Sequence, residues 1–143
     1  MKNNKIRVLF LCVQNTSRSQ MAEGLLRDMA GDEFEAFSAG SEATEIRPET
    51  IIIMRDIGID VSMQHSKSLA KFITEEFDYV ITVCSPAAEV CPYFPNAKHR
   101  LAWDFDDPAA VKGTEAERLA AYTRIRDEIA EKIDEFVRGL ILP

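Results

Sequence analysis

The sequence predicts a single α/β domain over residues 1–143, with a central parallel four-stranded sheet flanked by helices on both faces. Strand and helix signals alternate from the first residues, which is the pattern of a parallel sheet covered by helices. Two strand candidates, Ile6–Cys12 and Tyr79–Cys84, are nearly continuous apolar runs, as expected for strands buried on both faces. A chain of 143 residues normally closes one hydrophobic core, and no repeat, linker or low-complexity tract divides it.

The first half of the chain predicts two strands that alternate with two helices. The first strand is an apolar run without polar alternation, which indicates burial on both faces. The helix after it repeats apolar residues three and four apart along one face. A second strand follows, and a proline near the start of the next segment favours the first turn of a helix. These four elements are predicted at Ile6–Cys12, Ser17–Ala30, Phe34–Gly40 and Arg47–Ile57.

The second half predicts two more strands and a long helix. Tyr79–Cys84 is another buried apolar run, and a short strand is expected at Arg100–Trp103. Thr114, with Glu117 three residues later, forms a capping box that begins the last helix. The apolar stripe of that helix contains Leu119, Tyr122, Ile125, Ile129, Ile133, Phe136 and Leu140.

Composition excludes several classes of protein. Lys plus Arg total 17 against 24 Asp plus Glu, so the net charge is −7. An acidic chain lacks the basic face that nucleic acid or an anionic membrane requires. No apolar run approaches the roughly 20 residues of a membrane-spanning helix, and Val8–Val13 does not fit a signal peptide. We therefore expect a cytoplasmic protein without nucleic-acid or membrane partners, and a monomer because no apolar stripe is left over.

The segment from Cys12 to Ser19 joins the end of a predicted strand to the start of a helix. Ligands of open α/β sheets bind at the carboxyl ends of strands, and successive backbone N–H groups at a helix N-terminus bind anions. The planar guanidinium of Arg18 can reach two oxygens of a tetrahedral anion. The predicted oxyanion-binding residues are Val13, Gln14, Asn15, Thr16, Ser17, Arg18 and Ser19.

Cys12 is the candidate nucleophile of this loop. The positive field of the loop and the helix favours its thiolate over its thiol. Ser19 can donate to that thiolate, and Asn15 is a residue type that tolerates the positive φ of a tight loop. The alternative is a small buried cysteine beside a solvated Arg18. We favour the functional interpretation, because the cysteine closes a strand and the arginine opens a helix.

Together these motifs resemble a known family. The run Val8–Cys12, followed by Asn15 and Arg18, is similar to the low-molecular-weight protein tyrosine phosphatases and to the arsenate reductases that share their fold. Phe37–Gly40 and Gly58–Ser62 resemble further stretches of that family, so the similarity covers most of the chain. The resemblance implies the phosphatase-like fold, which has a flavodoxin-like architecture. The Cys-x5-Arg-Ser loop alone does not separate a hydrolase from a reductase.

The two other cysteines favour the reductase. Cys84 ends a predicted parallel strand, which puts it at the same sheet edge as Cys12, and Cys91 lies seven residues later. A phosphatase needs no second thiol there, whereas a reductase needs a thiol pair to supply two electrons. This separation is similar to that in the thioredoxin-coupled arsenate reductases. The resemblance implies that Cys12 attacks arsenate, Cys84 attacks Cys12, and Cys91 then attacks Cys84, leaving a disulfide for thioredoxin.

Two alternatives remain open for Cys84 and Cys91, namely inert burial or a metal site with His99. The six residues between them exceed the usual spacing of about two to four, and one histidine leaves such a site short of ligands. A fully helical segment would part the two Cα atoms by roughly 10 Å. A disulfide needs about 4.4–6.8 Å, so we expect the segment to loop out on oxidation.

Asp107 is the remaining catalytic candidate. The resemblance implies that the aspartate before Pro108 protonates the leaving oxygen, with Asp106 as the less favoured residue. The alternative is an Asp-Pro turn on the surface. The phosphatases usually follow this proline with tyrosine, and Ala109 and Ala110 in its place weigh against tyrosine phosphate as substrate.

The resemblance also bears on metal binding. Some of the reductases hold a potassium ion with an Asn, a Glu, a Ser and an Asp, and the first three match Asn15, Glu23 and Ser38. The fourth position is Lys67. Its ammonium would supply the positive charge itself and repel a cation, so we expect no potassium, no other metal and no bound cofactor.

These interpretations predict a thioredoxin-coupled arsenate reductase. Its ligand is arsenate or a phosphate-like oxyanion, and thioredoxin is its external reductant. One alternative is a low-molecular-weight phosphatase that forms a Cys12 phospho-enzyme. A second is a non-catalytic oxyanion or redox sensor, in which the thiols only switch conformation.

Overall fold

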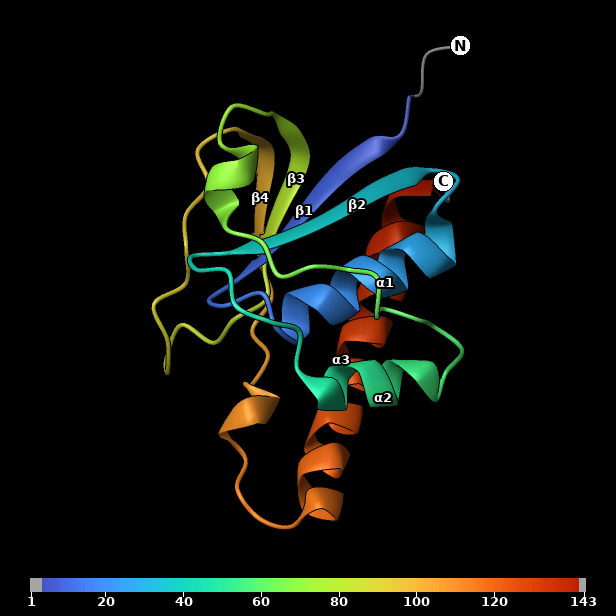
Figure 1. The fold of residues 1–143 in the computed structure, drawn as a ribbon. Helices are drawn as coiled ribbons and strands as arrows, with labels where there is room; N and C mark the ends of the chain where they lie inside the picture. The colour runs from blue at the N-terminus through green and yellow to red at the C-terminus, as the bar shows by residue number, and fades with distance from the viewer. Residues whose placement is uncertain (1–3, 142–143) are drawn as a thin grey trace.

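The computed structural model describes residues 4–141, whose four strands form one parallel sheet in the order β2-β1-β3-β4 (Figure 1). The predicted α/β class and four-stranded parallel sheet are confirmed. No helix within the described residues is long and apolar enough to cross a membrane. The elements are β1 (Ile6–Cys12), α1 (Arg18–Ala30), β2 (Phe34–Gly40), α2 (Pro48–Arg55), the 3-10 helix η1 (Leu69–Phe72), β3 (Phe77–Thr82), β4 (Ala97–Ala102), the 3-10 helix η2 (Pro108–Ala110) and α3 (Glu115–Ile141).

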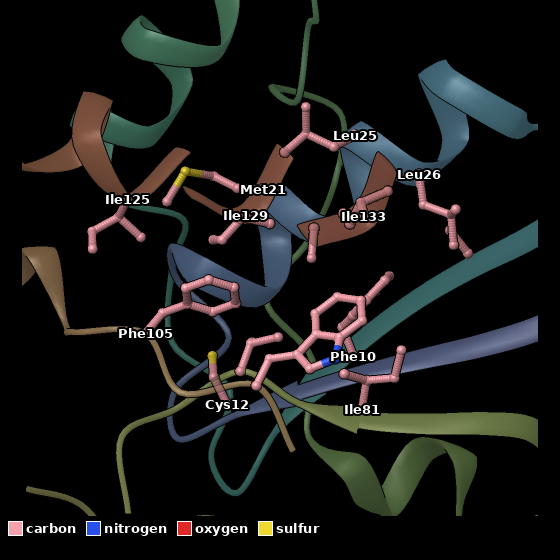
Figure 2. Packing of buried hydrophobic residues seen from close by; sticks show 14 of the residues in the cluster. Phe10, Cys12, Met21, Leu25, Leu26, Ile81, Phe105, Ile125, Ile129 and Ile133 are labelled. Carbon is pink, nitrogen blue, oxygen red and sulfur yellow. The ribbon is translucent and has the colours of Figure 1, made fainter. Parts of the chain in front are cut away.

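Strand β1 is buried on both faces, as its continuous apolar run predicted. Successive side chains of a strand point to opposite faces. Val8 and Phe10 pack against α1 and α3, whose apolar residues complete the larger core (Figure 2). Leu9 and Leu11 face the other way and pack with Phe72 of η1. Helices thus flank both faces, but unequally, because a single 3-10 turn stands where the first face has two long helices.

Element boundaries differ most from the prediction at the last two strands. β3 covers Phe77–Thr82 instead of Tyr79–Cys84, because Phe77 enters the register opposite Ala97 of β4. Cys84 therefore lies two residues beyond the strand, in the loop that follows. β4 begins three residues earlier than predicted, because it is an edge strand whose mostly exposed side chains carry little apolar signal. The helices begin and end within two residues of their predicted limits.

Helix α3 begins with the predicted capping box. The backbone N–H of Thr114 donates to Glu117 Oε1 at 3.0 Å, and the backbone N–H of Glu117 donates to Thr114 Oγ1 at 3.1 Å. Four residues of the predicted apolar stripe are fully buried, namely Tyr122, Ile125, Ile129 and Ile133. Leu140 departs from the prediction, because it lies near the end of the helix and is 39% exposed.

Candidate active site

A pocket of about 180 Å³ lies at the carboxyl end of the sheet. The loops after β1, β3 and β4, which supply most of its lining, come together at this end (Figure 1). Five of the seven predicted oxyanion-binding residues line it beside Cys12. Residues from the three loops and from the start of α2 complete it. Its lining residues are Cys12, Val13, Gln14, Thr16, Ser17, Arg18, Arg47, Glu89, Asp107 and Ala109.

The other two predicted residues, Asn15 and Ser19, do not line the pocket. They contact the Cys12 sulfur instead. The backbone N–H of Asn15 donates to Cys12 Sγ at 3.2 Å, and Ser19 Oγ lies 2.8 Å from the same sulfur. Asn15 has φ of 56°, the left-handed conformation that the tight loop was predicted to need. The sulfur is buried, with two donors that can stabilise a thiolate.

Gly40 sets the position of the loop from the neighbouring strand. It pairs with Cys12 in the register between β1 and β2. A Cβ atom at Gly40 would lie 2.7 Å from the carbonyl oxygen of Val13 and 2.8 Å from the backbone nitrogen of Asn15. Only glycine lets the loop backbone approach this closely. Gly40, at the end of β2, therefore helps to determine the backbone conformation of the loop after Cys12.

Arg18 is the positive charge of the pocket. Its two terminal nitrogens each donate to one carboxylate oxygen of Glu89 at 2.6 Å, and Nη1 also donates to the carbonyl of Phe105 at 3.0 Å. Burial acts to lower the pKa of Arg18, but the hydrogen bond to Glu89 and the neighbouring charges of Cys12 and Asp107 raise it overall. The guanidinium therefore stays protonated, and in this structure its anionic partner is the Glu89 carboxylate.

Cys84 and Cys91 are joined by a disulfide, with their Cα atoms 6.0 Å apart. This is the pairing that the resemblance implied for the final oxidised state. Because the two thiols are bonded to each other, both alternatives for them, inert burial and a metal site, are wrong for this structure. His99 instead stacks on Tyr79, with ring centroids 4.9 Å apart. The loop that the disulfide closes contributes Glu89 to the pocket.

Comparison with known proteins identifies the family. The family model of the low molecular weight phosphotyrosine protein phosphatases matches residues 7–141. The chain belongs to this family. An arsenate reductase of Halalkalibacterium halodurans is 44% identical over 133 residues, which cover 93% of this chain and 96% of that protein.

Solved structures of arsenate reductases are also similar to this chain. An arsenate reductase in its oxidized state has a TM-score of 0.78 at 26% identity, covering 93% of this chain and 97% of the other. A thioredoxin-dependent arsenate reductase of Corynebacterium glutamicum has a TM-score of 0.73 at 32% identity, covering 97% of this chain and 63% of that one. These neighbours agree with the predicted phosphatase-like fold.

Within this family member, the structure places Asp107 and not Asp106 at the pocket. Asp107 Oδ2 lies 3.9 Å from Arg18 Nη2, and Asp107 Oδ1 accepts from the backbone N–H of Ala109 at 2.9 Å. That hydrogen bond caps η2 and orients the carboxylate. Asp106 is largely exposed and pairs with Arg124 at 3.5 Å. Of these two aspartates, Asp107 is therefore the one that can reach an oxyanion in the pocket.

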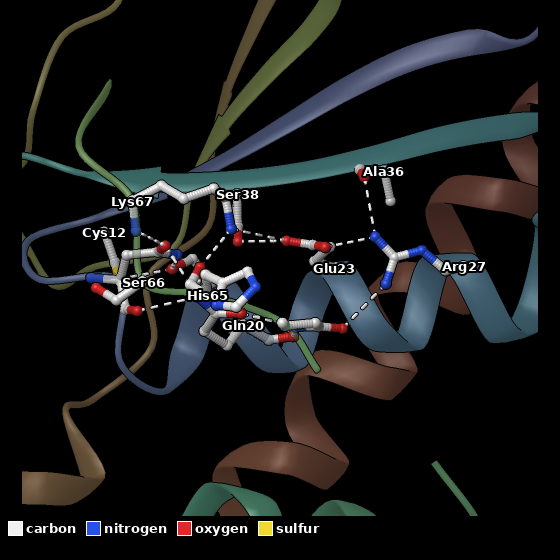
Figure 3. Close-up of polar contacts among 12 residues, drawn as sticks. Cys12, Gln20, Glu23, Arg27, Ala36, Ser38, His65, Ser66 and Lys67 are labelled. Carbon is white, nitrogen blue, oxygen red and sulfur yellow. Dashed lines mark hydrogen bonds and ion pairs between the residues drawn. The ribbon is translucent and has the colours of Figure 1, made fainter. Parts of the chain in front are cut away.

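Lys67 lies among the residues that were compared with a potassium site (Figure 3). Its Nζ is 3.6 Å from Glu23 Oε1, and its backbone N–H donates to Asn15 Oδ1 at 2.8 Å. Ser38 Oγ donates to the same Glu23 oxygen at 2.5 Å. Burial lowers the pKa of Lys67, and the charge of Glu23 opposes this. Over residues 4–141, no three His, Cys, Asp or Glu side chains are grouped to hold a metal ion.

Sequence reasoning missed two residues of the pocket, Arg47 and Glu89. Arg47 is the N-cap of α2 and was predicted only as the start of a helix. Glu89 was treated as part of the spacer between Cys84 and Cys91. The signal that could have found it is the single carboxylate in a segment expected to move when those two cysteines join.

Proposed function

We propose that this protein reduces arsenate to arsenite, using its own thiols as the source of electrons. The observation that carries the proposal is the disulfide between Cys84 and Cys91, because its loop lines the same pocket as Cys12 and Arg18. A phosphatase does not need this thiol pair in addition to its nucleophilic cysteine. The 44% identity to an arsenate reductase over nearly the whole chain supports the same substrate.

In the first step the pocket binds arsenate and Cys12 attacks it. The loop amides and the guanidinium of Arg18 hold the arsenate oxygens. The Cys12 thiolate forms a bond to arsenic, while an arsenic–oxygen bond breaks and the leaving oxygen departs as water. Asp107, which lines the pocket, gives this oxygen a proton. Arsenic remains pentavalent in the Cys12 adduct.

The next steps move the electrons. The Cys84 thiolate attacks Cys12 Sγ, a disulfide forms, and the electron pair of the sulfur–arsenic bond stays on arsenic, which leaves as trivalent arsenite. The Cys91 thiolate then attacks Cys84 Sγ and releases the Cys12 thiolate. The product is the Cys84–Cys91 disulfide. Thioredoxin, a dithiol, returns two electrons and two protons to these cysteines, in keeping with the thioredoxin-dependent structural neighbour.

A coupled assay tests this proposal. NADPH oxidation through thioredoxin reductase and thioredoxin is followed with arsenate for the wild type and for Cys12→Ser, Cys84→Ser and Cys91→Ser. We expect arsenate-dependent turnover in the wild type and its loss in all three variants. Wild-type protein that consumes no NADPH with arsenate and thioredoxin would contradict the proposal.

A weaker phosphatase activity of the same loop is the second candidate, and the family match and the position of Asp107 support it. Hydrolysis of p-nitrophenyl phosphate is the measurement. Cys12→Ser should abolish hydrolysis, whereas Cys84→Ser should preserve it, because no electrons are transferred. A protein that turns over neither arsenate nor the aryl phosphate would instead fit the sensor alternative.

A further inference from the structure

The Glu89 carboxylate is bound to the Arg18 guanidinium, the same group that an oxyanion substrate needs. Arg18 Nη1 donates to Glu89 Oε2 and Arg18 Nη2 donates to Glu89 Oε1, both at 2.6 Å. This two-pronged geometry is the one in which arginine holds two oxygens of a carboxylate, phosphate or arsenate. The Arg18 side chain is only 5% exposed, so few other directions are open to an incoming anion.

The disulfide loop positions this carboxylate. The backbone N–H groups of Ala88 and Glu89 donate to the carbonyl of Ser85 at 3.0 and 2.9 Å, forming a tight turn. The backbone N–H of Ser85 in return donates to Glu89 Oε2 at 2.9 Å. The same turn brings the Cα atoms of Cys84 and Cys91 within 6.0 Å. One turn therefore both closes the disulfide and carries the carboxylate that binds Arg18.

We propose that Glu89 is an internal ligand of the oxyanion site, installed by the Cys84–Cys91 disulfide, which excludes arsenate and phosphate from the oxidised protein. That arsenate is the substrate rests on the proposed function. The competition between Glu89 and phosphate for Arg18 does not. A second anion at Arg18 would meet the negative charge of Glu89 at close range and with little water between them. An oxidised molecule, which has no electrons to give, therefore keeps its substrate site closed.

The coupling acts in both directions. If the disulfide weakens oxyanion binding by some factor, bound oxyanion must favour the reduced dithiol over the disulfide by the same factor. Phosphate should thus shift the Cys84–Cys91 pair toward the dithiol in a glutathione redox buffer. Glu89→Gln keeps the size of the side chain and removes its charge, which should uncouple the two equilibria.

Inorganic phosphate is the probe for the test, with binding measured by calorimetry on the oxidised and reduced full-length protein. In the wild type we expect the reduced form to bind phosphate at least about tenfold more tightly than the oxidised form, which is the loss of one charged hydrogen-bonded contact. In Glu89→Gln the two forms should agree within about threefold. Glu45→Gln is the matched control, because exposed Glu45 lines the neighbouring hollow without contacting Arg18, and it should behave as the wild type.

Equal phosphate affinity of the oxidised and reduced wild type would overturn the proposal. So would an oxidised Glu89→Gln variant that is folded by circular dichroism and still excludes phosphate. Glu89→Asp tests whether the charge or the shape of the side chain matters. Because aspartate retains the carboxylate, this variant should keep part of the difference in phosphate affinity between the oxidised and reduced forms. Redox-dependent phosphate binding without arsenate turnover would refute only the proposed reductase, whereas turnover without redox-dependent binding would refute only the role of Glu89.

Discussion

Ser19 Oγ lies 2.8 Å from Cys12 Sγ and at the same time accepts from Asn15 Nδ2 at 2.7 Å. Because the amide of Asn15 donates to the hydroxyl oxygen, the hydroxyl hydrogen is free to point toward the sulfur. A hydroxyl that donates to sulfur stabilises the thiolate, which is the nucleophilic form of cysteine. Ser19 thus lies where it can stabilise the Cys12 thiolate without lining the pocket.

Ser19→Ala should slow the chemistry of Cys12. Loss of a hydrogen bond to a charged group costs about 1.5–3 kcal/mol, or roughly a tenfold to hundredfold lower reaction rate. Cys12 is the free thiol of the oxidised protein, so its alkylation by iodoacetamide measures this directly. Ser41→Ala, at an exposed serine just after β2, should react like the wild type. An unchanged alkylation rate in Ser19→Ala would show that the hydroxyl does not support the thiolate.

Gly40→Ala should damage the oxyanion loop from the adjacent strand. The new Cβ would collide with the backbone of Val13 and Asn15, so we expect phosphate affinity of the reduced protein to fall by at least about tenfold. The free energy of unfolding should fall by about 1–3 kcal/mol, as for other overpacked sites. Gly139→Ala is the control, because a Cβ at this position on the exposed end of α3 would meet nothing within 4 Å. It should be neutral or about 1 kcal/mol more stable.

Asp107→Asn should lower the hydrolysis of p-nitrophenyl phosphate, since the amide cannot supply a proton to the leaving oxygen. General acid catalysis contributes about 100-fold to 10,000-fold, so kcat should fall at least about 100-fold. Asp106→Asn tests the neighbouring carboxylate, whose partner is Arg124 and not the pocket. Equal losses of kcat in both variants would argue against a specific role for Asp107.

Potassium should not stabilise the protein more than sodium does. The ammonium of Lys67 already lies 3.6 Å from Glu23, and it would repel a second cation. The melting temperature should therefore agree within about 1 °C in the two salts at equal ionic strength. Lys67→Gln removes this charge from the buried carboxylate and should lower the free energy of unfolding by about 1–3 kcal/mol. A clear rise in melting temperature with potassium would contradict the prediction.

The stability of the oxidised protein should depend on pH through Glu89. The hydrogen bond from Arg18 lowers the pKa of Glu89 below its ordinary value of 4.5. A carboxylate with a lowered pKa in the folded state stabilises the fold above its unfolded pKa, and this stabilisation is lost as pH falls through the folded value. Thermal unfolding of the oxidised wild type and of Glu89→Gln, compared from about pH 7 down to about pH 3, measures it. The wild type should lose its advantage over the variant below about pH 4.5, and a constant difference would contradict the prediction.

Much of the fold could be predicted because its signals are local. The apolar run of β1, the capping box at Thr114 and the strand-to-helix loop after Cys12 depend on residues close together in the sequence. Burial on both faces of a parallel strand dictates an apolar run. The exposed edge strand β4 carries no such run, so its limits were predicted less well.

Local sequence signals were enough to predict the fold class, the loop with its cysteine and arginine, and the candidate thiol pair. Which side chains meet inside the pocket depends on how distant segments pack together. Glu89 is 71 residues from Arg18, and Lys67 reaches Glu23 from a different segment of the chain. No periodicity or local propensity encodes such contacts, because the packing of separate loops at one end of the sheet creates them. That packing makes Glu89, an inconspicuous residue between two cysteines, the partner of Arg18.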